Sequence, residues 1–126
     1  MTANGDNHPP RPTVLIVDDH AVFRSTVRAL LEYDGFEVIG EAGDGEAGVS
    51  AAQRLAPDVV LVDVRLPDID GFATAERLLA GGSGSAVILT SSSDDPLYPD
   101  RARRSGARGF VAKHDLSGAA LLRLLG

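Results

Sequence analysis

The chain has 126 residues, of which 44% are apolar, and this length and composition suit one domain with its own hydrophobic core. It contains no cysteine, which excludes disulfides, thiolate metal sites and cysteine nucleophiles. With 12 basic and 18 acidic side chains, the formal net charge is −6, so we expect no direct binding to nucleic acid. No apolar run approaches the roughly 20 residues of a membrane span, and the N-terminus lacks a secretory signal pattern. We therefore expect a cytoplasmic protein without membrane contact.

The first twelve residues differ from the rest of the chain. They are polar, include three prolines and show no hydrophobic periodicity. We interpret residues 1–12 as a disordered tail and residues 13–126 as the folded domain. His8 lies in this tail and is therefore a poor candidate for a ligand or a catalyst.

Five short apolar runs predict strands, at residues 13–17, 36–40, 59–62, 86–90 and 109–112. Three of these runs are almost continuously aliphatic, which is typical of a parallel sheet covered on both faces. Between the runs, apolar residues recur at helical spacing, and the three clearest sets are Phe23, Val27, Leu30, Leu31; Ala47, Ala51, Leu55; and Phe72, Ala75, Leu78, Leu79. Ser117 is a candidate cap for a last helix through Leu125. The alternation predicts an α/β fold in which five strands form one parallel sheet.

Polar residues stand where four of these strands end, and the carboxyl ends of parallel strands share one edge of the sheet. They are Asp18, Asp19, Asp63, Thr90 and Lys113, the last being the only lysine in the chain. Each alone has an ordinary structural explanation, such as capping a helix or carrying a surface charge. Three carboxylates at one edge, however, repel each other unless a cation holds them. Oxygen ligands without histidine or thiolate favour Mg²⁺, so the edge suits a phosphoryl group bound with Mg²⁺.

The sequence resembles the receiver domain of two-component response regulators. The matching segments are VLIVDDH (14–20), VVLVDVRLPDIDG (59–71), VILTSS (87–92) and GARGFVAKHD (106–115). The resemblance covers nearly everything after the tail and implies a flavodoxin-like (βα)5 fold with strand order 2-1-3-4-5.

The resemblance also implies a role for each matching residue. Asp63 corresponds to the phosphoacceptor, which takes a phosphoryl group from a sensor histidine kinase or a phosphotransfer protein. Asp18, Asp19, Asp63 and the backbone carbonyl of Arg65 would hold Mg²⁺. Thr90 and Lys113 would contact the phosphoryl oxygens. Thr90 and Phe110 correspond to the switch residues, and Pro67 and Gly71 shape the loop after Asp63.

The chain departs from the family pattern at three places. His114 follows Lys113 where proline is usual, and we expect a trans peptide there because a cis bond before a non-proline residue is costly. Phe110 replaces the usual tyrosine and has no hydroxyl to signal outward. Pro96 and Pro99 interrupt the segment after the fourth strand, so we expect the fourth helix to be short and to start near Pro99.

Two other features have mainly structural interpretations. His20, next to the acid pair, is interpreted as a helix-start residue rather than as a ligand. A basic cluster is interpreted as a solvated helix face, with docking of an acidic partner as the less favoured alternative; it contains Arg101, Arg103, Arg104 and Arg108.

We therefore expect a phosphorylation-controlled signalling module that switches the binding of a downstream protein. It would not be a turnover enzyme, although it would catalyse its own phosphorylation and dephosphorylation. We favour a stand-alone module, because the chain begins with Met and stops at the fifth predicted helix. The alternative is the truncated input domain of a DNA-binding regulator of the LuxR/NarL type, which the DDH start favours.

An Mg²⁺-dependent phosphatase with an aspartyl nucleophile fits poorly, since Arg65 stands where those enzymes carry a second acid. A flavin-binding module would need a phosphate-binding loop where Asp18 and Asp19 lie.

Overall fold

The computed structural model describes residues 11–126, so the expectation of a disordered tail falls almost entirely outside the described residues. The strands are β1 (Thr13–Val17), β2 (Glu37–Ala42), β3 (Val59–Asp63), β4 (Ala86–Ser91) and β5 (Gly109–Ala112). The helices are α1 (Ala21–Tyr33), α2 (Gly45–Leu55), α3 (Gly71–Ala80), α4 (Tyr98–Arg104) and α5 (Gly118–Leu125), and a 3-10 turn, Lys113–Asp115, follows β5. Strands and helices therefore alternate along the chain, as the sequence predicts.

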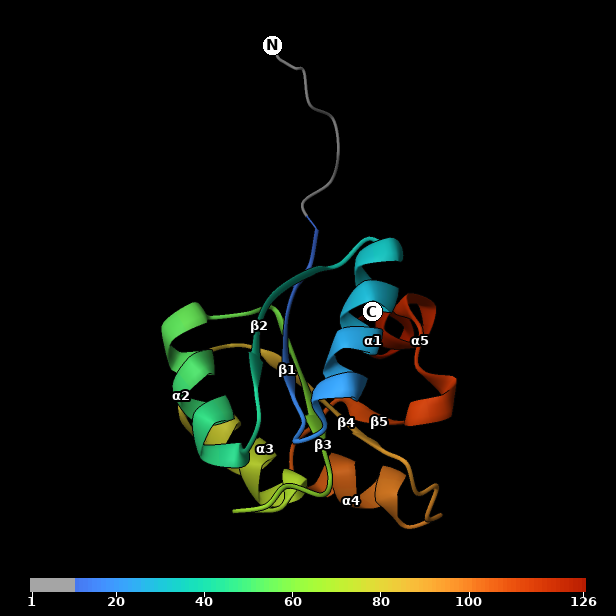
Figure 1. Ribbon diagram of the computed structural model, residues 1–126. Coiled ribbons are helices and arrows are strands. Elements are labelled where there is room, and N and C mark those ends of the chain that lie inside the picture. The colour runs from blue at the N-terminus through green and yellow to red at the C-terminus, as the bar shows by residue number, and fades with distance from the viewer. Residues whose placement is uncertain (1–10) are drawn as a thin grey trace.

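All five strands are parallel and lie in the order β2-β1-β3-β4-β5, which confirms the predicted fold (Figure 1). The order reverses between β1 and β3, so the loops that follow these two strands leave in opposite directions and open a crevice at the carboxyl edge. β3 and β4 pair as far as Asp63 and Thr90, which lie opposite each other in register.

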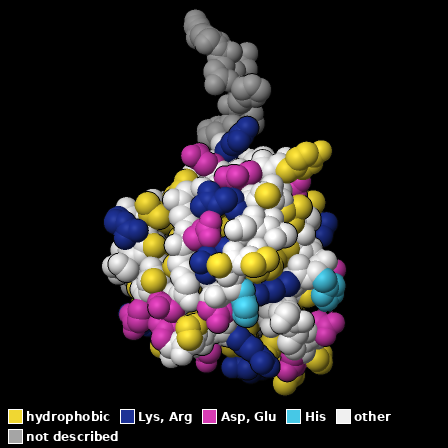
Figure 2. All heavy atoms as spheres, viewed as in Figure 1, with side chains coloured by type: hydrophobic (Ala, Val, Ile, Leu, Met, Phe, Trp, Pro, Cys, Tyr) yellow, Lys and Arg dark blue, Asp and Glu magenta, His cyan; other side chains and the backbone are white. Residues whose placement is uncertain are grey.

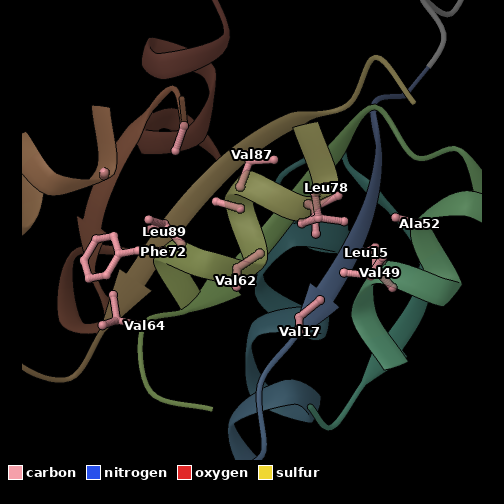
Figure 3. Packing of buried hydrophobic residues seen from close by; sticks show 14 of the residues in the cluster. Leu15, Val17, Val49, Ala52, Val62, Val64, Phe72, Leu78, Val87 and Leu89 are labelled. Carbon is pink, nitrogen blue, oxygen red and sulfur yellow. The ribbon is translucent and has the colours of Figure 1, made fainter. Parts of the chain in front are cut away.

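The core lies on both faces of the sheet because successive strand residues point to opposite sides. Val14 and Ile16 of β1 pack with α1 and α5 on one face. Leu15 and Val17 pack with α2, α3 and α4 on the other face (Figure 3). Figure 1 shows α1 and α5 together on one side of the sheet, with α2 and α3 on the opposite side. Every residue of β3 and β4 is buried, which explains their continuous apolar sequence.

Some boundaries differ from those expected from the sequence. The second strand starts and ends later than predicted, at Glu37 and Ala42, and the third and fourth strands each extend one residue further, to Asp63 and Ser91. Pro12 already contacts the sheet, because its carbonyl accepts a hydrogen bond from the Glu37 amide at 2.9 Å. The strand ends thus include polar residues that the search for apolar runs left out.

The helix signals in the sequence are largely confirmed. Ser117 caps α5 by accepting a bond from the Ala120 amide at 3.0 Å, and α4 is short, with Pro99 in its first turn. Leu30 and Leu79 share the predicted helix faces but remain partly exposed, because each lies at the edge of its buried stripe. No cis peptide bond occurs within residues 11–126, so the bond before His114 is trans, as expected. None of the helices in this range combines the length and apolarity needed to cross a membrane.

Candidate functional site

The crevice at the carboxyl edge of the sheet brings together the polar residues predicted from four strand ends. Asp18 follows β1, Asp63 and Thr90 belong to the ends of β3 and β4, and Lys113 follows β5. The first three residues are almost completely buried, with exposed fractions of 1%, 3% and 1%. Buried carboxylates require compensating charge or hydrogen bonds, because taking an unpaired charge out of water costs free energy.

Lys113 provides the compensating charge for both buried carboxylates. Its Nζ lies 2.7 Å from Asp18 Oδ2 and 3.3 Å from Asp63 Oδ2. The same ammonium lies 4.0 Å from the centre of the Phe23 ring, in a cation–π contact with α1. Phe23 and the two carboxylates thus hold the lysine over the crevice.

The environment of Asp63 makes its ionisation difficult. Burial raises the pKa of this carboxyl above its usual value, and the nearby charge of Asp18 raises it further. The Arg65 amide, which donates to Asp63 Oδ1 at 3.2 Å, and the Lys113 ammonium lower the pKa and only partly offset this effect. Additional positive charge in the crevice would therefore favour the carboxylate form of Asp63.

Thr90 presents a hydroxyl that lacks a partner. Its Oγ1 is buried and forms no hydrogen bond with any part of the chain that the structure describes. A buried hydroxyl normally has a partner, because leaving it unpaired costs about 1–3 kcal/mol. Since Thr90 lies directly opposite Asp63 on the neighbouring strand, a group bound to Asp63 could accept its hydrogen bond.

Asp19 and His20 lie at the exposed side of the crevice. His20 is the N-cap residue of α1, which agrees with its interpretation as a helix-start residue. Its Nδ1 also lies 3.2 Å from Asp18 Oδ1 and 3.1 Å from Asp19 Oδ1. The premise that no histidine accompanies the carboxylates is therefore wrong, because the turn into α1 folds the ring back over the two residues that precede it.

The loop between β3 and α3 is held close to Asp63. A Cβ on Gly71 would meet the Asp63 carbonyl and lie 2.7 Å from Val64 Cα, so only glycine fits there. Asp68 ties the loop to α2, because its carboxylate accepts the Gly45 and Glu46 amides, each at 2.8 Å. These bonds lower the pKa of Asp68 to about 2. The sequence analysis named Gly71 but missed Asp68, whose only sequence signal is its place in the loop after Asp63.

Phe110 is half-buried and belongs to an aromatic row. Its ring meets Tyr98 of α4 edge-on at 5.5 Å between centroids, and Tyr98 in turn lies 5.6 Å from Phe72 of α3. Phe110 also lines a cleft of about 550 Å³ between the 94–99 segment, β5 and α5. The sequence analysis did not identify Tyr98 because it lies outside the matching segments.

The basic cluster after β4 is largely engaged within the chain. The Arg101 guanidinium lies 4.1 Å from the centre of the Phe72 ring, and Arg104 pairs with Asp100 at 2.8 Å. Arg108 reaches the carbonyl of Leu125 at 3.2 Å. These contacts favour the structural interpretation of the cluster. Figure 2 shows charged side chains of both signs spread over the face in view, with apolar side chains between them.

The residues present fit a hard divalent cation. Ligand atoms of Asp18, Asp19, His20 and Asp63 all lie within 4.8 Å of one another. Carboxylate oxygens are the ligands that Mg²⁺ prefers, and the buried carboxylates of Asp18 and Asp63 share the ammonium of Lys113 between them. Arg65 contributes its amide to Asp63, and a role for its carbonyl as a metal ligand stays a prediction.

Comparison with known proteins gives a consistent result. A family model described as the response regulator receiver domain matches residues 14–123. The chain is 41% identical over 102 residues to the virulence factors putative positive transcription regulator BvgA of Bordetella pertussis, covering 81% of this chain and 49% of BvgA. It is 37% identical over 112 residues to the transcriptional regulatory protein PdtaR of Mycobacterium tuberculosis, covering 89% and 54%. The chain thus spans about half the length of the curated relatives it matches.

Solved structures show the same similarity. The signal receiver domain of the putative response regulator NarL from Mycobacterium tuberculosis superimposes with a TM-score of 0.82 at 34% identity, covering 94% of this chain and 99% of that one. The CheX-CheY-BeF3-Mg complex from Borrelia burgdorferi gives a TM-score of 0.81 at 27% identity, covering 97% and 91%. Together with the family match over most of its length, these similarities show that the chain belongs to the response regulator receiver domain family.

Proposed function

We propose that this receiver domain accepts a phosphoryl group on Asp63 in a reaction that depends on Mg²⁺. One observation carries the proposal: a buried carboxylate with a raised pKa lies 3.3 Å from a lysine ammonium and opposite an unpaired buried hydroxyl. Such a site favours added positive charge and offers a hydrogen bond that only a bound group can accept. The donor is a phosphohistidine on a sensor histidine kinase or a phosphotransfer protein.

In the transfer, an oxygen of Asp63 attacks the phosphorus while the bond from phosphorus to the histidine nitrogen breaks. The electron pair stays on that nitrogen, and the product is an acyl phosphate on Asp63. Asp18, Asp19 and Asp63 would hold Mg²⁺, which would neutralise charge on the phosphoryl oxygens. Lys113 turns its ammonium from the bare carboxylate to a phosphoryl oxygen, and the Thr90 hydroxyl donates to another.

The phosphoryl group then changes the surface through Thr90 and Phe110. Thr90 gains a partner only in the phosphorylated state, and this differential contact shifts the conformational equilibrium. Phe110 transmits the change by packing alone, to Tyr98 and to the cleft beside α5. A downstream protein binds the altered surface.

The domain is not a turnover enzyme, although it catalyses its own phosphorylation and dephosphorylation. It acts in the cytoplasm and does not itself contact nucleic acid.

A second candidate is that the domain is the input part of a DNA-binding regulator. Two curated relatives are described as transcription regulators, and this chain matches about half of each. The printed descriptions of these relatives support this alternative, whereas the family match itself is to the receiver domain alone. An aspartyl phosphatase is not favoured, because the family match is to receiver domains.

Intact-protein mass spectrometry after treatment with acetyl phosphate and Mg²⁺ tests the proposal. We expect an adduct of about 80 Da, the mass of one phosphoryl group, which is lost in Asp63→Asn. Asp70→Asn is the matched control, since Asp70 is exposed and caps α3, a role that asparagine also fills. Undiminished labelling of Asp63→Asn would exclude the assignment.

A further inference from the structure

We propose that His20 is a ligand of the divalent cation held beside Asp18 and Asp19, and that its imidazole gives the site a selective affinity for Zn²⁺. The inference rests on the cation site of the proposed function and adds a residue and a second class of cation to it. A borderline cation such as Zn²⁺ accepts imidazole nitrogen readily, whereas Mg²⁺ prefers oxygen ligands.

The positions of the ligand atoms support this role. His20 Nδ1 lies 3.2 Å from Asp18 Oδ1 and 3.1 Å from Asp19 Oδ1. Neighbouring ligands about 2.1 Å from one cation are separated by roughly 3.0–3.4 Å, depending on the coordination geometry. One nitrogen and two oxygens are thus already spaced as adjacent ligands.

The helix start does not use the imidazole of His20. His20 is the N-cap of α1, yet its side chain forms no capping hydrogen bond, and its amide donates to Asp18 Oδ1 at 2.8 Å. Nδ1 itself is within hydrogen-bond distance of Asp18 Oδ1, a contact that a cation between the two atoms would replace. The side chain is 67% exposed, so the ring can adjust to a cation without disturbing the core. The amide bond meanwhile fixes the Asp18 carboxylate relative to the start of the helix.

An unpartnered buried atom independently indicates that this crevice receives a ligand. Thr90 Oγ1 is buried and forms no hydrogen bond within residues 11–126. Asp18 Oδ2, by contrast, pairs with the Lys113 ammonium at 2.7 Å. Because Lys113 occupies the Oδ2 side of Asp18, a cation would bind at the Oδ1 side, where His20 and Asp19 lie.

Isothermal titration calorimetry with Zn²⁺ and with Mg²⁺ tests the inference. In His20→Phe, which keeps a ring but removes both nitrogens, we expect the affinity for Zn²⁺ to fall about tenfold or more. The affinity for Mg²⁺ should change less than about threefold. His114→Phe is the matched control, because His114 is similarly exposed and lies beyond Lys113, and it should leave both affinities unchanged.

Two results would overturn the inference: equal affinity for Zn²⁺ in wild type and His20→Phe, or equal loss of affinity for both cations. His20→Gln, which keeps a polar residue at the helix start, repeats the test if the phenylalanine variant misfolds. Mg²⁺-dependent labelling by acetyl phosphate separates this inference from the proposed function. If wild type and His20→Phe are both labelled and bind Zn²⁺ with equal affinity, only the role of His20 is contradicted. Absent labelling with intact, His20-dependent Zn²⁺ binding contradicts only the phosphoacceptor assignment.

Discussion

The ring of Tyr98 in α4 meets the ring of Phe110 in β5 edge-on, with their centroids 5.5 Å apart. Three residues after Phe110, Lys113 contacts the Asp63 carboxylate. β5 therefore connects the proposed phosphorylation site to α4. This helix has seven residues and begins with Tyr98 and Pro99. The contacts of Tyr98 with Phe110 and Phe72 attach the first turn of α4 to β5 and to α3.

Truncating Phe110 to alanine should weaken that attachment without removing the chemistry of Asp63. We expect Phe110→Ala to lower the free energy of unfolding by about 1–3 kcal/mol, less than a fully buried phenylalanine would cost. Phosphorylation by acetyl phosphate should persist. Hydrogen-exchange changes caused by beryllofluoride across residues 91–106 should become smaller than in wild type.

Val111→Ala is the control for Phe110→Ala, since Val111 is the next residue of β5 and packs on the opposite face of the sheet. It should leave the exchange response of residues 91–106 intact. An equal response in wild type and Phe110→Ala would show that the ring is only part of the core and does not couple Thr90 to α4.

The sequence predicted contacts between residues close in the chain and contacts that the strand order fixes. It did not predict contacts that depend on where helices and loops pack. Continuous apolar runs located the strands, and the rule that parallel strands end at one edge brought Asp18, Asp63 and Lys113 together. The ring of Phe23 over Lys113 and the clamp of Asp68 on α2 depend on helix placement, which hydrophobic periodicity does not specify. Whether the Thr90 hydroxyl has a hydrogen-bond partner depends on the groups packed around it in the folded protein. No sequence pattern predicts that it has none.

Replacing Gly71 by alanine should disturb the site through the backbone. The new Cβ would lie 2.7 Å from Val64 Cα, so the chain directly after Asp63 must move. We expect a fall of about 1–3 kcal/mol in the free energy of unfolding and slower labelling of Asp63. In the control Gly81→Ala, the nearest atom lies 3.5 Å from the new Cβ and φ is −72°, so stability should be unchanged or rise by about 0.4–1 kcal/mol. Urea denaturation measures both variants, and equal stabilities would contradict the proposed close approach.

Thr90→Val should stabilise the unphosphorylated protein, which is the opposite of the usual effect of changing a buried residue. Valine has the same shape and removes a buried hydroxyl that lacks a partner, so we expect a gain of about 1 kcal/mol. Thr74→Val provides the comparison, because the equally buried Thr74 hydroxyl donates to the Asp70 carbonyl at 2.8 Å. That substitution should cost about 1 kcal/mol.

The same Thr90→Val protein should respond less to a phosphoryl mimic. Beryllofluoride with Mg²⁺ should raise the melting temperature of wild type and of Thr74→Val by similar amounts, and that of Thr90→Val by less. A full response in Thr90→Val would mean that its hydroxyl does not bind the phosphoryl group.

The raised pKa of Asp63 predicts how stability depends on pH. Burial raises this pKa most, with a further increase from Asp18, and the opposing effects of the Arg65 amide and Lys113 do not cancel it. A carboxyl with a raised folded-state pKa binds its proton more tightly in the native protein than in the unfolded chain. Its contribution to stability is fully present below the unfolded value of about 3.8 and is lost as the pH rises through the folded-state pKa.

Asp63→Asn keeps the size of the side chain and removes this ionisation. Without divalent cations, we expect the variant to melt at a higher temperature than wild type at pH 7, with a difference that shrinks as the pH falls towards 4. Added Mg²⁺ should also reduce the difference, because a cation stabilises the wild-type carboxylate. The exposed cap variant Asp70→Asn should show little difference from wild type over the same range. Melting curves at several pH values measure the difference in melting temperature between Asp63→Asn and wild type. If this difference does not vary with pH, Asp63 ionises in the folded protein as readily as in the unfolded chain.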